Sequence, residues 1–151
     1  MSNQAHSAYL ESRILTADPL ELIRLMYQAA IGEVRSARQH LANRAIRPRS
    51  QAISKACAIL TELTVALDRK AAGEYAGRMA DLYGYMMRKL AEANFQQRDE
   101  PMVEVLGLLS TLLEGWEGVQ RLLDSKSAQP IQAGPWTAVQ ETAYTPQAWS
   151  F

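Results

Sequence analysis

The residues of this sequence most able to do chemistry are two histidines and one cysteine, His6, His40 and Cys57. Helical di-iron proteins place a glutamate three residues before a ligating histidine, but Asn3 and Ala37 occupy those positions here. Cys57 stands among alanine and isoleucine residues, a setting typical of a small buried thiol and not of a nucleophile. We therefore expect neither a metal centre nor nucleophilic catalysis.

Phosphate chemistry is not expected either. The glycines are dispersed through apolar stretches and form no glycine-rich phosphate loop. Arg44, Arg47 and Arg49 cluster around one polar connection, where exposed arginines usually belong to a solvated loop. The sequence thus predicts a protein that is not an enzyme and that needs no cofactor.

The charge balance gives no reason to expect nucleic acid or an anionic membrane as a partner, because 16 Lys and Arg residues offset 16 Asp and Glu residues. Hydrophobic residues make up 48% of the 151 residues, which is enough for one domain with a sizeable core. No window reaches the roughly 20 apolar residues of a membrane span, and the N-terminus lacks the apolar run of a signal peptide. A single cysteine fits a reducing compartment. We expect a cytoplasmic protein.

Four amphipathic helices are predicted after an N-terminal segment. Asp18 is suited to cap the first, with Pro19 in its first turn and Glu21 three residues after the cap. Apolar residues then continue at helical spacing to about Asn43, and the second helix is expected over about 48–67.

The third helix is expected within the stretch from Leu67 to Asn94 and on to about Gln96, because apolar residues recur there three or four apart. Asn94 is suited to terminate it, since asparagine tolerates the left-handed conformation. Asp99 is suited to cap a fourth helix over about 100–124, with Pro101 in its first turn.

The fourth helix has an unusually wide apolar arc, and a stripe of small residues lies away from its main face: Gly107, Thr111, Gly115 and Gly118. Two interpretations are open. In one, the helix is wedged between two neighbours, with glycine where backbones approach closely. In the other, part of the arc receives a segment from another chain.

These patterns predict an all-α fold, an antiparallel up-down four-helix bundle, because long helices joined by short connections pack against their neighbours in sequence. We expect an N-terminal strap over residues 1–17, the bundle over 18–124, and a flexible tail rich in proline and aromatic residues over 125–151. The strap is either packed on the bundle or displaced from a binding surface by a partner. The aromatic residues of the tail could also fold back onto an apolar groove.

Several motifs resemble, in their order and spacing, those of the FliS family, the flagellin-specific export chaperones of the flagellar type III system. They are Tyr9 in the strap, TADPLELIRLMYQAAI over 16–31, LTVALD over 63–68, LYGYMMRKLAEAN over 82–94 and EVLGLLSTLLEGWEGV over 104–119. The resemblance covers about residues 9–122, so the tail lies outside it.

The resemblance implies a chaperone that binds the disordered C-terminal segment of flagellin in the cytoplasm, prevents premature polymerisation and helps to present the subunit to the export gate. It implies a client segment that wraps the bundle, and a strap that lies on the apolar surface in the free state. The expected partners are therefore flagellin and a component of the export gate, without nucleic acid or membrane insertion. The free protein is expected to be a monomer or a weak homodimer.

The expected partner-binding residues are apolar residues of the strap and boundary residues of the later three helices, where methionine and tyrosine supply adaptable contacts. They are Tyr9, Leu10, Ile14, Ile59, Leu63, Tyr75, Met79, Tyr83, Met86, Val105, Leu108 and Leu112. The alternative interpretation is a helical interaction module with a different partner, or a homodimer formed through the wide face of the fourth helix.

Overall fold

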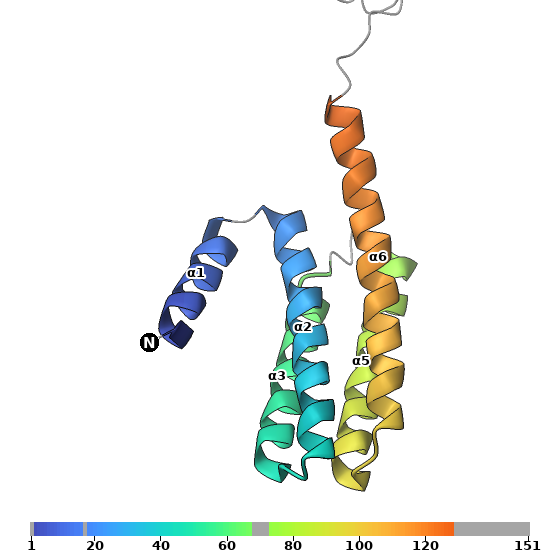
Figure 1. Cartoon of the computed structure of the whole chain (residues 1–151). Helices are drawn as coiled ribbons and strands as arrows, with labels where there is room; N and C mark the ends of the chain where they lie inside the picture. Colours follow the sequence, from blue (N-terminus) through green and yellow to red (C-terminus); the bar gives the residue numbers. More distant parts are fainter. Residues whose placement is uncertain (1, 17, 68–72, 129–151) are drawn as a thin grey trace, which may run out of the picture. The chain divides into compact units, whose positions relative to one another are not determined.

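The computed structural model describes residues 2–16, 18–67 and 73–128 (Figure 1). The helices in these ranges are α1 (Ser2–Thr16), α2 (Pro19–Ala42), α3 (Ile46–Val65), α5 (Glu74–Gln96) and α6 (Glu100–Ala128). No strand occurs in them, in agreement with the all-α prediction. The chain divides into two compact units, Met1–Glu117 and Gly118–Phe151, with the boundary inside α6.

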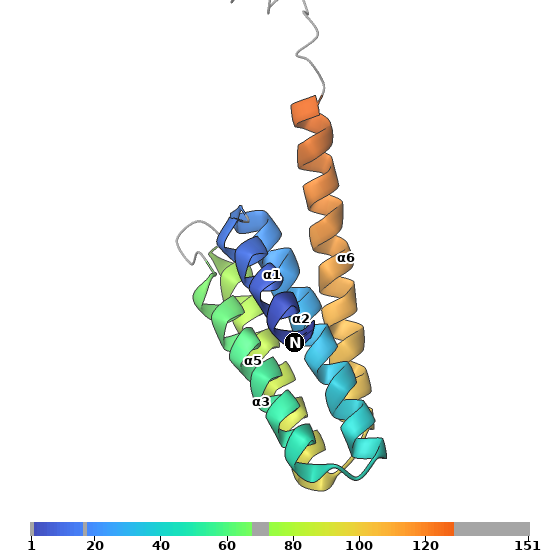
Figure 2. The ribbon, with the colours of Figure 1, turned by 60° about the vertical axis from the view of Figure 1, so that its left-hand side comes forward.

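The first unit contains the antiparallel bundle that the sequence predicts. Figures 1 and 2 show α2, α3, α5 and the part of α6 up to Glu117 running in alternating directions. α3 packs on both α2 and α5. Side-chain hydrogen bonds place α6 beside α2 and α5. The Trp116 indole N–H of α6 donates to the backbone oxygen of Leu20 of α2 at 3.1 Å, and the Tyr85 hydroxyl of α5 donates to Glu104 of α6. The neighbours around the bundle are therefore α2, α3, α5 and α6, in that order.

The core is built from the inward stripe of each of these helices. Its buried residues are Tyr27, Ala30, Ile31, Val34, Ala37, Ala52, Ile53, Ala56, Leu60, Leu63, Met79, Tyr83, Met86, Leu90, Ala93, Met102, Val105 and Leu109. They recur three or four apart along each helix, which is the spacing that keeps a stripe on one face.

The start of α2 confirms the predicted cap. Asp18 is in the extended conformation, and its carboxylate accepts from the backbone N–H of Glu21 at 2.7 Å. This bond satisfies one of the amide groups that the first turn leaves without a helical partner. Pro19 lies in the first turn, where its missing N–H costs nothing.

The second predicted helix begins earlier than expected, at Ile46 instead of near Pro48. Pro48 is tolerated because it falls in the first turn of α3, where no N–H is needed for the helical ladder. The backbone N–H of Arg49, the next residue, donates to the oxygen of Ala45 at 3.1 Å and so begins that ladder.

The prediction that Asn94 terminates the third helix is wrong. α5 continues to Gln96, and Gln97, at φ +54°, takes the left-handed conformation. The Asn94 side chain instead accepts from Arg49 Nε at 2.9 Å and from the Ser50 hydroxyl at 3.2 Å. A residue suited to a helix end is used here to tie α5 to α3.

Asp99 precedes α6 as predicted, but its carboxylate serves another helix. Arg38 of α2 donates to it twice, from Nε to Oδ1 at 2.8 Å and from Nη2 to Oδ2 at 2.9 Å. The backbone oxygen of Asp99 accepts from Met102 and Val103 at the start of the helix. Asp99 therefore begins α6 with its main chain and fixes it to α2 with its side chain.

The helices at the two ends of the described chain add to the outline drawn from sequence. The expected strap is a helix over Ser2–Thr16, and α6 continues beyond Asp124 to Ala128. Residues 129–151, which hold most of the predicted tail, lie outside the described residues. None of the described helices combines the length and apolar character that a membrane span requires.

The glycines of α6 test one part of the first interpretation, that glycine marks a close approach of two backbones. A Cβ built on Gly107 or on Gly115 would meet no atom within 4 Å, and both residues are exposed. Close backbone approach among the described residues therefore does not explain these two glycines, although α6 does lie between α2 and α5 as the first interpretation expects.

Candidate docking groove

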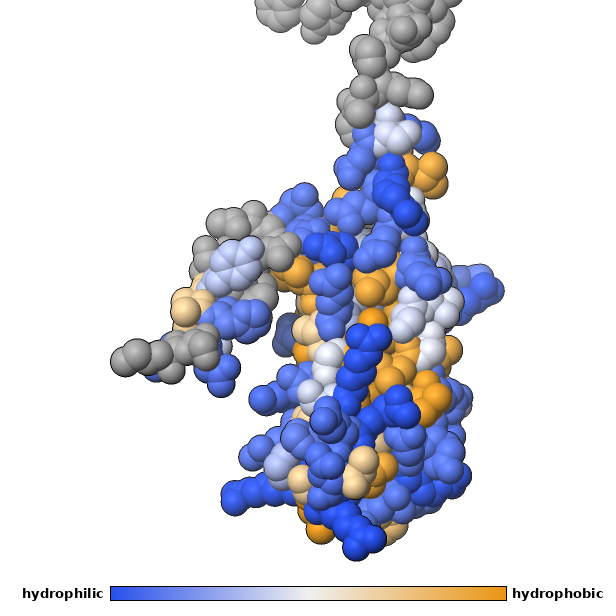
Figure 3. Space-filling model, viewed as in Figure 1, coloured by the Kyte–Doolittle hydropathy of each residue, from blue (hydrophilic) through white to orange (hydrophobic). Residues whose placement is uncertain are grey.

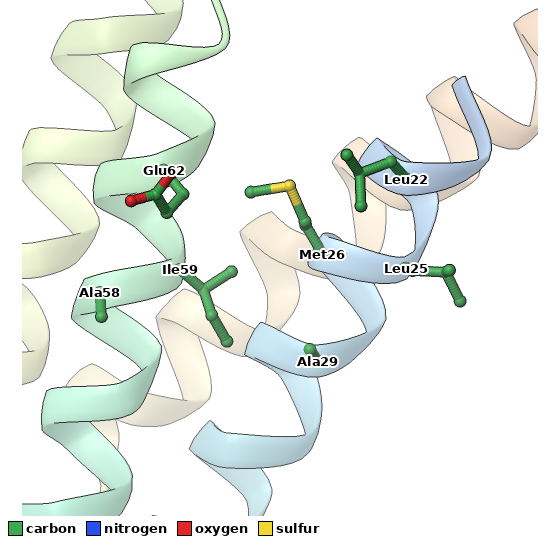
Figure 4. Close-up of a pocket in the computed structure, with 7 residues that line it drawn as sticks. All are labelled: Leu22, Leu25, Met26, Ala29, Ala58, Ile59 and Glu62. Carbon is green, nitrogen blue, oxygen red and sulfur yellow. The ribbon is translucent and has the colours of Figure 1, made fainter. Parts of the chain in front are cut away.

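An open apolar groove lies between α2 and α3 in the first unit (Figure 4). Its volume is about 330 Å³. It is lined by Leu22, Leu25, Met26, Ala29, Ala58, Ile59 and Glu62. The close-up shows the Met26 side chain projecting into the space opposite Ile59 and Glu62. A concave surface of this size with few polar groups is the usual form of a binding site.

The groove exists because both helices carry more apolar residues than the core can take. On α2 the core stripe includes Tyr27 and Ala30, whereas Leu22, Leu25 and Ala29 fall on the adjoining stripe. Leu22 and Leu25 are half-buried and Ala29 is exposed. α3 adds Ala58, which is also exposed. The groove is therefore an outward apolar strip next to the core of the described bundle.

Among the described residues that line the groove, Glu62 is the only charged one. It lies in the last turn of α3, which has no basic residue. Among the described residues Glu62 forms no ion pair. By contrast, Glu21 at the start of α2 accepts a hydrogen bond from Arg24 Nε at 2.8 Å. That hydrogen bond raises the pKa of Arg24. The groove is thus apolar along most of its length and negative at one end.

A second hollow, between α2 and α6, has a different chemical character. It is lined by Gln28, Ile31, Arg35, Ser110, Leu113, Glu114 and Glu117, of which most are polar or charged. Figure 3 shows this face of the molecule, where apolar side chains of α6 reach the surface beside charged ones. The α2–α3 groove is the more apolar of the two.

Five of the sequence-predicted binding residues belong to the core and not to a groove: Leu63, Met79, Tyr83, Met86 and Val105. They lie on the inward stripes of their helices, where 3.6-residue spacing places them beside other core residues. The Tyr83 hydroxyl shares a hydrogen bond with the hydroxyl of Tyr27. Burial, followed by this hydrogen bond, raises the pKa of Tyr83.

The half-buried predicted residues fall on two different sides of the bundle. Ile59 lines the α2–α3 groove. Leu108 and Leu112 follow Glu104 at four-residue steps on α6, and Glu104 contacts Tyr85 of α5. These leucines therefore lie toward the α5–α6 seam, opposite the groove, and the structure does not bring them together with Ile59.

The aromatic candidates near the helix starts are exposed. Tyr9 in α1 and Tyr75 at the start of α5 each have 60% of their surface accessible. Leu10 and Ile14 also belong to α1, but their side chains lie outside the described part of the structure.

Sequence reasoning missed the α2 wall of the groove because it looked for binding residues only on the strap and on the later three helices. The signal was present: Leu20, Leu22, Ile23, Leu25 and Met26 are five apolar residues within seven positions, more than one inward stripe holds. Ala58 and Glu62 carried no such signal, since an exposed alanine and an exposed glutamate are ordinary on a helix surface.

Comparison with known proteins gives a consistent result. The family model described as flagellar protein FliS matches residues 1–122. The chain is 33% identical over 111 residues to the flagellar secretion chaperone FliS of Salmonella typhimurium, covering 73% of this chain and 82% of that protein. It is also 33% identical over 116 residues to the flagellar secretion chaperone FliSB of Pseudomonas aeruginosa, covering 77% of this chain and 92% of that protein.

A solved structure described as a flagellar chaperone from bacteria has the same fold. It superposes with a TM-score of 0.65 at 18% sequence identity, and the match covers 80% of this chain and 98% of the other.

Proposed function

The chain belongs to the FliS family of flagellar secretion chaperones, and we propose that it binds the disordered C-terminal segment of flagellin in the cytoplasm. The family is one of chaperones and not of enzymes. In this proposal, binding prevents premature polymerisation of flagellin and prepares the subunit for delivery to the export gate.

The open α2–α3 groove is the observation that carries this proposal. A chaperone for an unfolded segment needs apolar surface that remains accessible in its own folded state. The groove supplies leucine, methionine and isoleucine side chains from two antiparallel helices, the arrangement that receives the apolar face of a third helix. Leu22 and Ala29 are seven residues apart on α2, so the groove accommodates about 10 Å of helix, or two turns.

Leu108 and Leu112 provide a second contact surface in the same proposal. They lie toward the opposite seam of the bundle, so a segment that reaches both surfaces has to wrap around it. Such binding orders a long stretch of chain, and the cost of that ordering offsets part of the gain from apolar burial.

Calorimetric titration tests the proposal directly. The ligand is a peptide of about the last 40 residues of flagellin from the same genome, a length suited to wrapping. We expect a one-to-one complex of sub-micromolar affinity with a negative heat-capacity change, because apolar surface is buried. No heat at several temperatures from a folded protein would contradict the proposal. If the protein did not bind flagellin and its molecular mass in solution rose with its concentration, the homodimer alternative would be favoured instead.

Two double variants and one single-site control locate the site. Ala29→Asp combined with Ala58→Asp places charge on exposed positions in the groove and should weaken binding at least about tenfold, since burying an unpaired carboxylate is costly. Ala91→Asp, on an exposed position of α5, is the control and should bind like the natural protein.

The double variant Leu108→Asp and Leu112→Asp tests the second surface. If it is folded and binds with unchanged affinity, that surface is not part of the site.

A further inference from the structure

We infer that the segment bound in the α2–α3 groove carries a lysine or arginine that faces Glu62, at the end of an apolar stretch about two turns long. This inference deepens the proposed function and rests on it: it states the chemistry of the client that the groove selects. It depends on the electrostatics of one end of the groove and not on its apolar length.

The first observation is the position of Glu62. It lines the groove together with Ile59 and Ala58, on the wall opposite Met26, as Figure 4 shows. Among the described residues no lysine or arginine forms an ion pair with it. A bound segment that covers Ile59 and Met26 therefore passes the Glu62 carboxylate and changes its solvation. A cationic side chain at that point offsets the loss of water, and an apolar or acidic one does not.

The second observation is the end of α3 itself. The C-terminal turn of a helix has a partial negative charge, which lysine or arginine in that turn normally balances. The last turn of α3 contains no basic residue. Glu62 adds a negative charge to an end that is already negative. Both contributions have the same sign, and among the described residues no lysine or arginine balances them, either within the last turn of α3 or by an ion pair with Glu62.

Together these features give the bound segment a register. Apolar side chains fill the space between Leu25, Ala29 and Ile59, and the cation lies over the last turn of α3. Sliding the segment by one residue removes the cation from Glu62 and rotates the apolar stripe by about 100°. The charge therefore fixes which stretch of an apolar client docks in the groove, whereas the apolar wall supplies affinity.

The test uses the full chain and two pairs of ligands. The first pair consists of amphipathic helical peptides unrelated to flagellin, with an identical apolar stripe that ends in lysine or in glutamate. The second pair is the flagellin C-terminal peptide and versions with single basic residues changed to glutamate. Binding is measured to the natural protein, to Glu62→Lys and to Glu62→Gln. Asp81→Lys changes an exposed acid on α5 and is the matched control.

We expect the lysine-ended peptide to bind the natural protein about fivefold more tightly than the glutamate-ended one. Glu62→Lys should reverse this preference, Glu62→Gln should abolish it, and Asp81→Lys should leave it unchanged. For one basic residue of the flagellin peptide, the change to glutamate should weaken binding to the natural protein and strengthen binding to Glu62→Lys. Equal binding of both designed peptides, or binding of neither, overturns the inference. Binding of the designed pair with the expected preference, but not of flagellin, upholds the inference and refutes the flagellin assignment.

Discussion

Two tyrosine hydroxyl groups meet inside the bundle, and each has the other as its partner. Tyr27 of α2 and Tyr83 of α5 are both buried, their hydroxyl groups share a hydrogen bond, and their ring centroids are 6.5 Å apart. Burial raises the pKa of both phenols, so both stay protonated at any ordinary pH. The pair is therefore a polar contact between non-neighbouring helices that does not depend on charge.

The pair should show non-additive energetics. Tyr83→Phe leaves the Tyr27 hydroxyl buried without its partner and should destabilise the protein by about 1–3 kcal/mol. Tyr27→Phe should do the same. The double variant removes both hydroxyl groups and should cost clearly less than the sum of the two single changes. Urea unfolding of the four proteins measures this coupling, and strictly additive losses would falsify the paired-hydroxyl account.

At the scale of the helix, α6 uses glycine where packing does not require it. Gly107 and Gly115 lie in the interior of the helix, are exposed and have open space around the position of a Cβ. Gly73, the cap of α5, is different because its φ of +53° lies in the left-handed region that L side chains rarely adopt.

Alanine substitution should therefore have opposite effects at the two kinds of position. Gly107→Ala and Gly115→Ala should each stabilise the protein by about 0.5–1 kcal/mol, because alanine restricts the unfolded chain and favours the helix. Gly73→Ala should destabilise it through backbone strain. The measurement is the free energy of unfolding in urea, compared between variants for which that free energy depends equally steeply on urea concentration. Destabilisation by Gly107→Ala would show that the position has a contact in the folded chain.

The four bundle helices and one local cap were predictable from the sequence, whereas the helix α1 and the side-chain partners that are distant in sequence were not. The cap at Asp18 acts within one turn, so its signal is local, and the prediction is confirmed. Asn94 and Asp99 also carried local signals, but Arg49 and Arg38 come from helices distant in sequence and take over their side chains. The sequence next to Asn94 and Asp99 gives no indication of these distant partners.

The same limit applies to the candidate groove. Periodicity places a residue on a stripe but does not say which stripe a neighbouring helix covers. Tyr83 and Met86 were expected on a binding surface and are in the core, whereas Leu25 and Ala29 line the groove. The roles in client binding assigned to Tyr9, Ile59, Leu108 and Leu112 stay predictions until the titrations are done.

At the scale of the whole bundle, the Arg38–Asp99 ion pair joins the first helix pair to the second. The guanidinium of Arg38 holds the pKa of Asp99 below its usual value. Because the unfolded chain has the higher pKa, it takes up the proton first as the pH falls. The contribution of this pair to stability is thus present above about pH 4 and is lost as the pH falls through the lower folded value.

Asp99→Asn should remove this part of the acid sensitivity. Both side chains are more than a third exposed, so we expect a loss of about 1 kcal/mol or less at pH 7 and no loss near pH 2. Urea unfolding of the natural protein and of the variant at both pH values is the measurement. Asp81→Asn, an exposed acid on α5, is the control. An equal difference at both pH values would assign the effect to the helix start and not to the ion pair.

The polar ties between helices are placed unevenly along the bundle. Arg38–Asp99, Arg49–Asn94 and Ser50–Asn94 all lie near the turns that connect α2 to α3 and α5 to α6. Toward the other end, where Glu62 and Leu22 lie, the bond from Trp116 to Leu20 connects α6 to α2, and the hydrogen bond between Tyr27 and Tyr83 connects α2 to α5. Local opening that begins at this second end leaves the three ties intact and needs less free energy than global unfolding. We therefore expect backbone amides of the end that holds the groove to exchange with solvent faster than those beside the three ties, which hydrogen exchange measures residue by residue.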